Sequence, residues 1–211
     1  MRVSTVAAFG FAVNAGLSGT AWADKLSVEG DVLIYDTNLA ALSQDQEILA
    51  TDLPRFKTLL RENPDIKTLR LNSPGGIVWV GEEMAHIVED YELDTVAGGE
   101  CSSTCVLVFL AGQERQMTRG SKIGFHQTNW NPSSVESYYN NRKDDNGWQT
   151  PFDFASWMYQ DTQTEVYLGL TNLVERGVDA AFAIETIRSN VDVWFPSRKE
   201  LVAAGVLRDA P

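Results

Sequence analysis

The first apolar positions after the N-terminal region change from the spacing of a strand to that of a helix and back. Apolar and polar side chains alternate between residues 25 and 35, which predicts a strand. Residues 53–60 place their apolar side chains on one helical face, and Thr51 or Asp52 precedes them as a candidate N-cap. Alternation returns at residues 67–71, where we expect a second strand.

A turn and a helix follow that second strand. The segment 72–76, with the sequence Asn-Ser-Pro-Gly-Gly, contains the residue types that end a strand and form a turn. The helix after it is predicted from one apolar stripe, made of Val80, Met84, Ile87, Val88 and Tyr91. These segments make one strand, turn and helix unit.

A second unit of the same kind begins at residues 93–97. We expect this strand to break at Gly98 and Gly99, and residues 106–111 are apolar on every side, as in a buried helix. Residues 122–126 suggest a further strand. Repeated strand and helix units predict an α/β fold with a mainly parallel sheet covered by helices.

The second half of the chain begins with a polar segment. Residues 129–150 are rich in Asn, Ser, Asp and Tyr, which predicts an inserted loop, extended here to about residue 156. Residues 166–174 and 178–188 favour two helices. The sequence from Ser197 to Glu200 has the spacing of a capping box, so a short helix is expected to start there.

The first 23 residues have the three parts of a signal peptide. Arg2 is their only charged residue, an apolar stretch runs from Val6 to Leu17, and Ala21-Trp22-Ala23 supplies the small residues of a cleavage site. An uncleaved anchor or a first core helix is the alternative, but glycines interrupt the stretch and it is short for a membrane span. We expect cleavage after Ala23, a periplasmic or secreted mature chain of residues 24–211, and no stable membrane insertion.

The composition is that of one globular domain, with 44% hydrophobic and 22% charged residues in a chain of 211. The formal net charge is −12. Such a surface repels nucleic acid and anionic lipid, so neither is expected as a partner. No internal repeat or interdomain linker divides the sequence.

The segment Cys101-Ser102-Ser103-Thr104-Cys105 lies between the glycine break and an apolar helix. A serine there lies at a helix N-terminus, where free N–H groups and the helix dipole favour a developing negative charge. This position suits a nucleophile. The plainer alternative is that Ser102 or Ser103 caps the helix.

The chain has two histidines, and only His126 is placed as a general base. His126 ends an apolar strand, whereas His86 is expected on the surface of its helix among Glu82, Glu83 and Glu89. A histidine on a strand is more often a structural residue than a base. The argument for His126 therefore depends on what lies near it.

The glycines of Ser73-Pro74-Gly75-Gly76 permit a turn that can aim N–H groups at a bound carbonyl oxygen. This turn ends one strand as the Ser103 segment ends the next. Because open sheets bind ligands at the carboxyl ends of their strands, the two segments can meet at one edge.

Three runs together resemble the Clp protease proteolytic subunit, within the wider crotonase-like superfamily. They are the turn at residues 71–76, the Ser103 helix that ends in Ala111-Gly112, and Phe125-His126-Gln127. The match extends in order from about Lys67 to Gln127 and resumes weakly at residues 195–207. The resemblance implies a ClpP/crotonase-like fold of repeated ββα units.

The resemblance also implies the roles of the site residues. Ser103 would attack a scissile carbonyl, and His126 would accept its proton. The N–H groups of Gly76 and Thr104, with Gly75 in the same turn, would form the oxyanion hole. A hydroxyl needs such a base to become a nucleophile, and one oxyanion donor typically lowers the barrier by ~3–4 kcal/mol.

The third member of the triad departs from the family. The family has an aspartate where Ser189 stands in this sequence. Asn190, as an uncharged acceptor, or Asp192, as a carboxylate, is the alternative partner of the imidazole. A missing carboxylate can lower the rate by several orders of magnitude.

Cys101 and Cys105 have no counterpart in the cytosolic family. They can form a disulfide if Cys101 precedes the helix, because two helical cysteines four positions apart have Cβ atoms ~5–6 Å apart. Two buried thiols are an alternative. A metal site of both cysteines and His126 is disfavoured because it lacks an evident fourth ligand.

We therefore expect a periplasmic serine peptidase that cleaves exported polypeptides through an acyl-enzyme. No metal or other cofactor is required by this chemistry. A homo-oligomer is possible, but its size is not predicted. The alternative is a catalytically impaired ClpP-like protein that binds peptides or acts as a scaffold, which the serine at position 189 favours.

Overall fold

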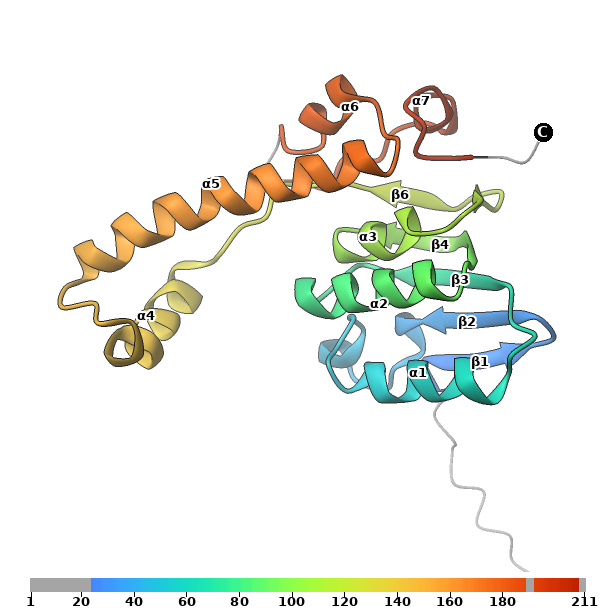
Figure 1. Cartoon of the computed structure of the whole chain (residues 1–211), viewed down its shortest axis with the longest axis horizontal. Helices are drawn as coiled ribbons and strands as arrows, with labels where there is room; N and C mark the ends of the chain where they lie inside the picture. Colours follow the sequence, from blue (N-terminus) through green and yellow to red (C-terminus); the bar gives the residue numbers. More distant parts are fainter. Residues whose placement is uncertain (1–23, 189–191, 209–211) are drawn as a thin grey trace, which may run out of the picture.

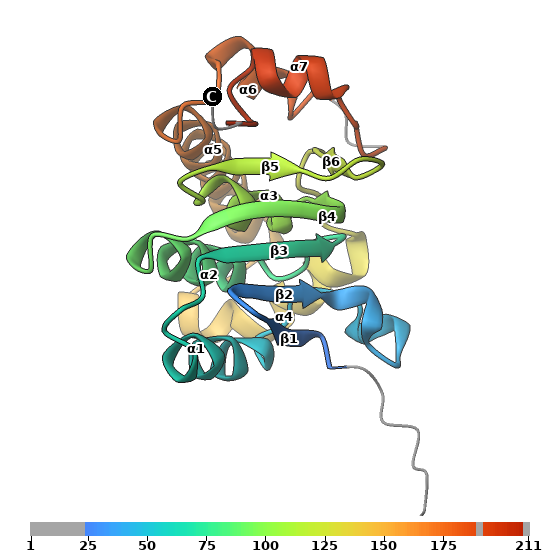
Figure 2. The same cartoon turned by 90° about the vertical axis from the view of Figure 1, so that its right-hand side faces the viewer.

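The computed structural model of the chain describes residues 24–188 and 192–208. The predicted signal peptide lies outside the described residues. Five strands of a six-stranded sheet run in the order β1-β2-β3-β4-β5, and β6 pairs with the far end of β4 (Figures 1 and 2). The strands are β1 (Leu26–Glu29), β2 (Val32–Asp36), β3 (Thr68–Ser73), β4 (Asp94–Ser102), β5 (Arg115–Met117) and β6 (Lys122–Gly124).

All strand pairs except the first are parallel. β1 and β2 are antiparallel, and they form a hairpin where the alternation of residues 25–35 predicted one strand. Gly30 lies between them with a positive φ of 64°, which a glycine adopts without strain. A hairpin keeps the alternating pattern on both sides of its turn, and this explains the error.

Three helices connect the parallel strands and lie side by side along the sheet in Figure 1. They are α1 (Asp52–Glu62), α2 (Val78–Asp90) and α3 (Thr104–Leu110). The predicted apolar stripe of α2 is buried except for Tyr91, which follows the helix and is 44% exposed. The largest fully buried apolar side chains include Leu33, Phe56, Leu69, Leu71, Met84 and Phe109. The predicted mainly parallel α/β fold is confirmed.

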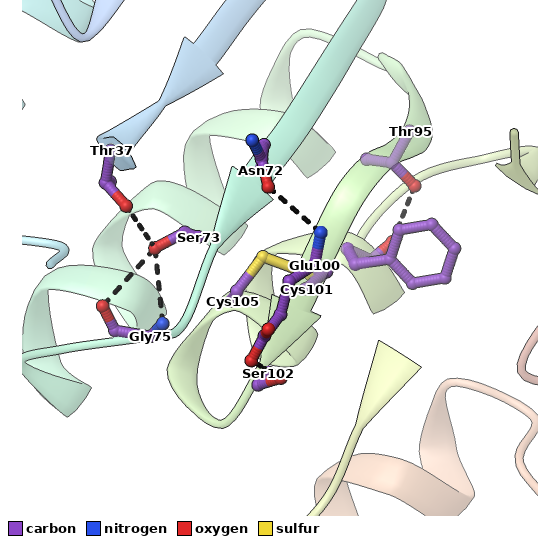
Figure 3. The surroundings of a disulfide bond; sticks show 10 residues. Thr37, Asn72, Ser73, Gly75, Thr95, Glu100, Cys101, Ser102 and Cys105 are labelled. Carbon is purple, nitrogen blue, oxygen red and sulfur yellow. Dashed lines mark hydrogen bonds between the residues drawn. A yellow bond between two sulfur atoms is a disulfide. The ribbon is translucent and has the colours of Figure 1, made fainter. Parts of the chain in front are cut away.

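Gly98 and Gly99 do not break their strand, contrary to expectation. β4 continues through them to Ser102, and its register with β3 shifts so that Leu71 pairs with Ala97 but Ser73 pairs with Cys101. The glycines form an irregularity in β4, where a Cβ on Gly99 would lie 2.3 Å from the Asn72 side chain. The Asn72 carboxamide oxygen accepts the Glu100 N–H at 2.9 Å there (Figure 3). β4 therefore reaches the site without losing its pairing.

The polar segment predicted as a loop is helical. It contains α4 (Pro132–Asn146) and the start of α5 (Pro151–Glu175). The two whole helices extend away from the sheet in Figure 1, and together they are called the α4–α5 arm. Asn131 caps α4, and Thr150 forms a capping box with Asp153 at the start of α5. α4 buries no residue, so its sequence has no apolar stripe. Periodicity therefore gave no sign of this helix.

The chain ends with two short helices, α6 (Ala180–Glu185) and α7 (Arg198–Ala203). The predicted capping box of α7 is present, because the Ser197 hydroxyl accepts the Glu200 N–H and the Glu200 carboxylate accepts the Ser197 N–H. In the described part of the chain, no helix is both long and apolar enough to cross a membrane.

A buried polar network ties the start of the described chain to α1. The Tyr35 hydroxyl donates to the Asp52 carboxylate at 2.6 Å, and the Lys25 ammonium lies 3.1 Å from the same carboxylate. Burial raises the pKa of the Tyr35 phenol, and the hydrogen bond to Asp52 adds to this effect. Asp52, at the start of α1, therefore links this helix to Lys25 and to Tyr35 of β2.

Candidate active site

Ser103 occupies a sharp turn between β4 and α3. Its φ of 55° and ψ of −127° are unusual for a residue with a side chain. The Ser103 side chain makes no capping hydrogen bond to α3. Ser103 is half-buried, whereas Ser102 and Thr104 on either side are buried. The structure therefore does not show the capping role that was the plainer alternative, and Ser102 lies in β4.

The glycine turn lies directly against Ser103. A Cβ added to Gly75 would be 2.8 Å from the Ser103 Cβ and 2.9 Å from the Ser102 carbonyl oxygen. Real Cβ atoms do not approach so closely, so only glycine lets the two backbones meet here. The structure thus brings the turn and the predicted nucleophile to one edge of the sheet, as the order of the strands predicted.

Ile48 fixes the outer side of this turn through two backbone bonds. The Ile48 N–H donates to the Gly75 carbonyl at 2.7 Å, and the Ile77 N–H donates to the Ile48 carbonyl at 3.0 Å. Because Ile48 bonds to Gly75 and Ile77, it takes up neither the N–H nor the carbonyl of Gly76, and the Gly76 carbonyl accepts the Thr104 hydroxyl at 2.9 Å. Gly76 therefore lies between Ile48 and the start of α3.

The three amides predicted for the oxyanion hole have different partners. The Gly75 N–H donates to the Ser73 hydroxyl at 3.2 Å, and that hydroxyl also accepts from Thr37 at 3.0 Å (Figure 3). Within residues 24–188 and 192–208, the Gly76 and Thr104 amides donate no hydrogen bond. These two amides are the ones left for an acceptor from outside the chain.

His126 emerges from the strand next to Ser103. β6 pairs with β4 in parallel, with Gly124 opposite Ser102, and the Ser103 N–H donates to the Gly124 carbonyl at 3.1 Å. His126 follows two residues later and is half-buried. The two predicted catalytic residues thus leave neighbouring strands at the same edge of the sheet.

The His126 ring has a defined orientation. Its Nδ1 lies 2.8 Å from the Gln127 carbonyl oxygen, which can only accept a hydrogen bond. This contact therefore favours the tautomer of a neutral imidazole that has its proton on Nδ1 and its lone pair on Nε2. No hydrogen bond joins His126 to Ser103 among the residues that the structure describes.

Three residues, Ser189, Asn190 and Asp192, are the candidates for the third member of the catalytic triad. Ser189 and Asn190 lie outside the described residues. Asp192 is exposed, and its segment forms an isolated antiparallel bridge, between Trp194 and Phe125, with the residues that follow β6. Continuing this register places Asp192 opposite Gln127. Asp192 makes no hydrogen bond to His126 in the described part of the chain.

Cys101 and Cys105 form the predicted disulfide, with their Cα atoms 5.3 Å apart. Cys101 lies in β4 and precedes α3, which is the condition that the sequence set for this bond. The interpretation as two free thiols is therefore wrong, and neither sulfur is a thiolate available to a metal. Figure 3 shows the bond beside the Ser102 end of β4.

Several supporting residues were missed by the sequence analysis. Thr37 bonds the Ser73 hydroxyl, and Asn72 bonds both the Glu100 amide and the Asp36 carboxylate. Glu100 also accepts the Ser102 hydroxyl at 2.8 Å and pairs with Lys122 at 2.7 Å. Most of these partners are 28 or 36 positions apart, so spacing along the chain could not reveal them.

Comparisons with known proteins support the fold. Neither a family model nor a curated protein sequence matches this chain. Solved structures do match: ClpP1 from Listeria monocytogenes has 16% identity and a TM-score of 0.54 over 76% of this chain and 84% of its own. A point mutant of that ClpP1 matches with 15% identity, the same TM-score and the same coverage. A peptidase from Plasmodium falciparum has 12% identity and a TM-score of 0.50, over 76% of this chain and 89% of its own. The chain therefore has the ClpP-like fold.

Proposed function

We propose that this chain is a serine peptidase-like hydrolase that cleaves polypeptides outside the cytosol. The observation that carries the proposal is the Ser103 turn. A non-glycine residue with a φ of 55° stands between a strand and a helix, its side chain does not cap that helix, and Gly75 packs against it. Strained serines in strand-to-helix turns are typical of nucleophiles.

In the first half of the reaction, the Ser103 Oγ attacks the scissile carbonyl carbon and its proton passes to His126 Nε2. The carbonyl oxygen becomes an oxyanion, and in this proposal it accepts hydrogen bonds from the Gly76 and Thr104 amides. The carbon–nitrogen bond then breaks, and Nε2 gives the proton to the leaving amine. The product is an ester between the acyl group and Ser103.

In the second half, water attacks the same carbon while Nε2 accepts its proton. The bond between the acyl carbon and Ser103 Oγ breaks, and the proton returns to that oxygen. The orientation of His126 supports these steps, because the hydrogen bond from Nδ1 to the Gln127 carbonyl leaves Nε2 as the acceptor.

The acceptor at Nδ1 sets an expectation for the rate. A backbone carbonyl orients the imidazole but carries no negative charge, so it stabilises the imidazolium less than a carboxylate does. We therefore propose a slow hydrolase. The leader sequence and the disulfide support a periplasmic or secreted location, because disulfides persist in oxidising compartments.

A fluorophosphonate probe tests this function on the mature protein exported by cells. The native chain is expected to form a covalent adduct, and Ser103→Ala is expected to form none. Ser102→Ala is the matched control, because it removes the neighbouring buried hydroxyl and should leave the adduct in place. Labelling of the Ser103→Ala variant would show that another residue is the nucleophile.

The second candidate function is a peptide-binding protein without turnover. It is favoured by one observation, the missing hydrogen bond between Ser103 and His126 among the described residues. Absence of any adduct on the native chain, together with measurable binding of peptides, would support this candidate over the hydrolase.

A further inference from the structure

The disulfide closes a loop around the candidate nucleophile. The bond joins Cys101, near the end of β4, to Cys105, in the first turn of α3 (Figure 3). Ser102, Ser103 and Thr104 are the residues between the two bonded positions. The loop therefore contains the strained Ser103 and the Thr104 amide. Both belong to the proposed hydrolytic site.

Both ends of the bond are attached to rigid parts of the fold. Cys101 pairs with Ser73 of β3 on one side and with Ile123 of β6 on the other. Cys105 is fully buried in α3, which packs so tightly on α2 that a Cβ on Gly81 would lie 2.2 Å from the Thr104 side chain. The bond thus joins the centre of the sheet to a fixed helix.

Apart from the packing of Gly75, few contacts restrain the Ser103 conformation. Its φ of 55° is unfavourable for a residue with a Cβ, and its side chain makes no capping bond that would compensate. Its backbone is held by the N–H bond to Gly124 and by the Val106 N–H, which donates to the Ser103 carbonyl at 2.9 Å. Without a further constraint, the turn can relax toward an ordinary backbone conformation.

We propose that Cys101 and Cys105 are positioning residues that hold Ser103 in its strained turn. This inference rests on the proposed function and deepens it. The bond restricts the ways in which β4 and α3 can separate, so the Ser103 hydroxyl and the Thr104 amide keep their relative positions. A misplacement of about 1 Å at a reacting group can lower a rate about 10²-fold.

The bridge is a permanent constraint rather than a rapid switch. Both cysteines are 0% exposed, so a reductant reaches the sulfurs only after the turn opens. A dithiol reductant then donates two electrons and two protons, which gives two cysteine thiols and a disulfide on the reductant. Reduction therefore requires unfolding in the presence of the dithiol, followed by refolding.

The test compares three forms of the mature protein: the oxidised native chain, the reduced native chain prepared in this way, and Cys101→Ala/Cys105→Ala. The reduced chain keeps every heavy atom, so it isolates the bond itself. We expect fluorophosphonate labelling to be about 10- to 100-fold slower in both forms that lack the bond. The pH midpoint of labelling should stay unchanged, because His126 is untouched.

A control separates positioning from stability. Leu60→Ala removes a buried side chain of α1 and should lower the unfolding midpoint while leaving the labelling rate of the oxidised chain unchanged. Equal labelling rates in the oxidised, reduced and double-alanine forms would overturn the inference. So would a Leu60→Ala rate that falls as far as theirs, because loss of stability alone would then explain the effect.

A second readout keeps this inference distinct from the proposed function. If the oxidised native chain forms no adduct, the hydrolase proposal fails, and amide hydrogen exchange at residues 103–106 still tests the bridge. Faster exchange at these amides after reduction would support the positioning role. Unchanged exchange would overturn it.

Discussion

The sheet half of the molecule, from β1 to β6 with α1 to α3, differs from the α4–α5 arm in how much of its sequence it buries. The sheet half contains the fully buried core residues, such as Leu33, Phe56 and Phe109. In the arm, α4 buries nothing and the long α5 buries only Phe154 and Leu173. Stability and the candidate site therefore depend on the sheet half.

The arm is held by contacts of another kind. Its aromatic rings contact one another near the tip, with Tyr138 stacked on Trp157 at 6.0 Å and Trp148 lying 4.8 Å from Phe154. Such pairs add about 0.5–1.5 kcal/mol each. The difference shows that a polar sequence can form helices when caps and ring contacts replace a buried face.

The largest expected difference between the two regions is in the free energy of unfolding. Phe56→Ala should lower it by about 3–5 kcal/mol, because it empties a fully buried site in the sheet half. Phe152→Ala in the arm should change it by less than about 0.5 kcal/mol, because that ring is 83% exposed. Urea unfolding measures both values. A loss from Phe152→Ala as large as that from Phe56→Ala would show that the arm shares the main core.

Two glycines with positive φ, one in each region, allow the regions to be compared by their effect on the labelling rate. Gly76→Ala should slow fluorophosphonate labelling about 10²- to 10³-fold, because its Cβ would lie 2.4 Å from the Ile48 carbonyl oxygen and displace a proposed oxyanion donor. Gly147→Ala, in the arm, adds a Cβ with nothing within 4 Å and should leave the rate unchanged. Comparable rates for the two variants would remove Gly76 from the site.

The smallest expected effect concerns the helix caps. Thr150→Ala should destabilise the start of α5 by about 1 kcal/mol, because the Thr150 hydroxyl caps that helix. Thr51→Ala should have little effect at the start of α1, because Thr51 makes no side-chain capping bond. Amide hydrogen exchange in the first turn of each helix measures the difference. An equal loss of protection in the two helices would show that α5 depends on its N-cap no more than α1 does.

The sequence predicted the sheet half best, because burial imposes a period on it. Residues 53–60 and the stripe of α2 were recognised from their spacing, and both segments are helices that pack on the core. The prediction failed at Gly98 and Gly99, where local residue types suggested a break. The pairing of β4 with strands on both sides, and the hydrogen bond from Glu100 to Asn72, outweigh that local preference.

The sequence pointed to the main residues of the candidate site, whose catalytic roles stay predictions, but not to the residues that support them. Ser103, His126 and the glycine turn stand in motifs that can be read along the chain, and the order of the strands brings them to one edge. Thr37 and Asn72 could not be found in this way, because their hydrogen bonds join residues far apart in sequence. In the arm, residues 166–174 were correctly predicted as helical, but α4 and the start of α5 were missed, because a polar helix without a buried face has no period.

Mapping the fluorophosphonate adduct by mass spectrometry of peptides from the native, oxidised chain tests the central claim most directly. We predict a single phosphonylated residue, Ser103, in the peptide that also contains the Cys101–Cys105 bond. An adduct on any other residue, or an unmodified Ser103 after prolonged exposure to the probe, would contradict the assignment of this turn as the nucleophile of a hydrolase.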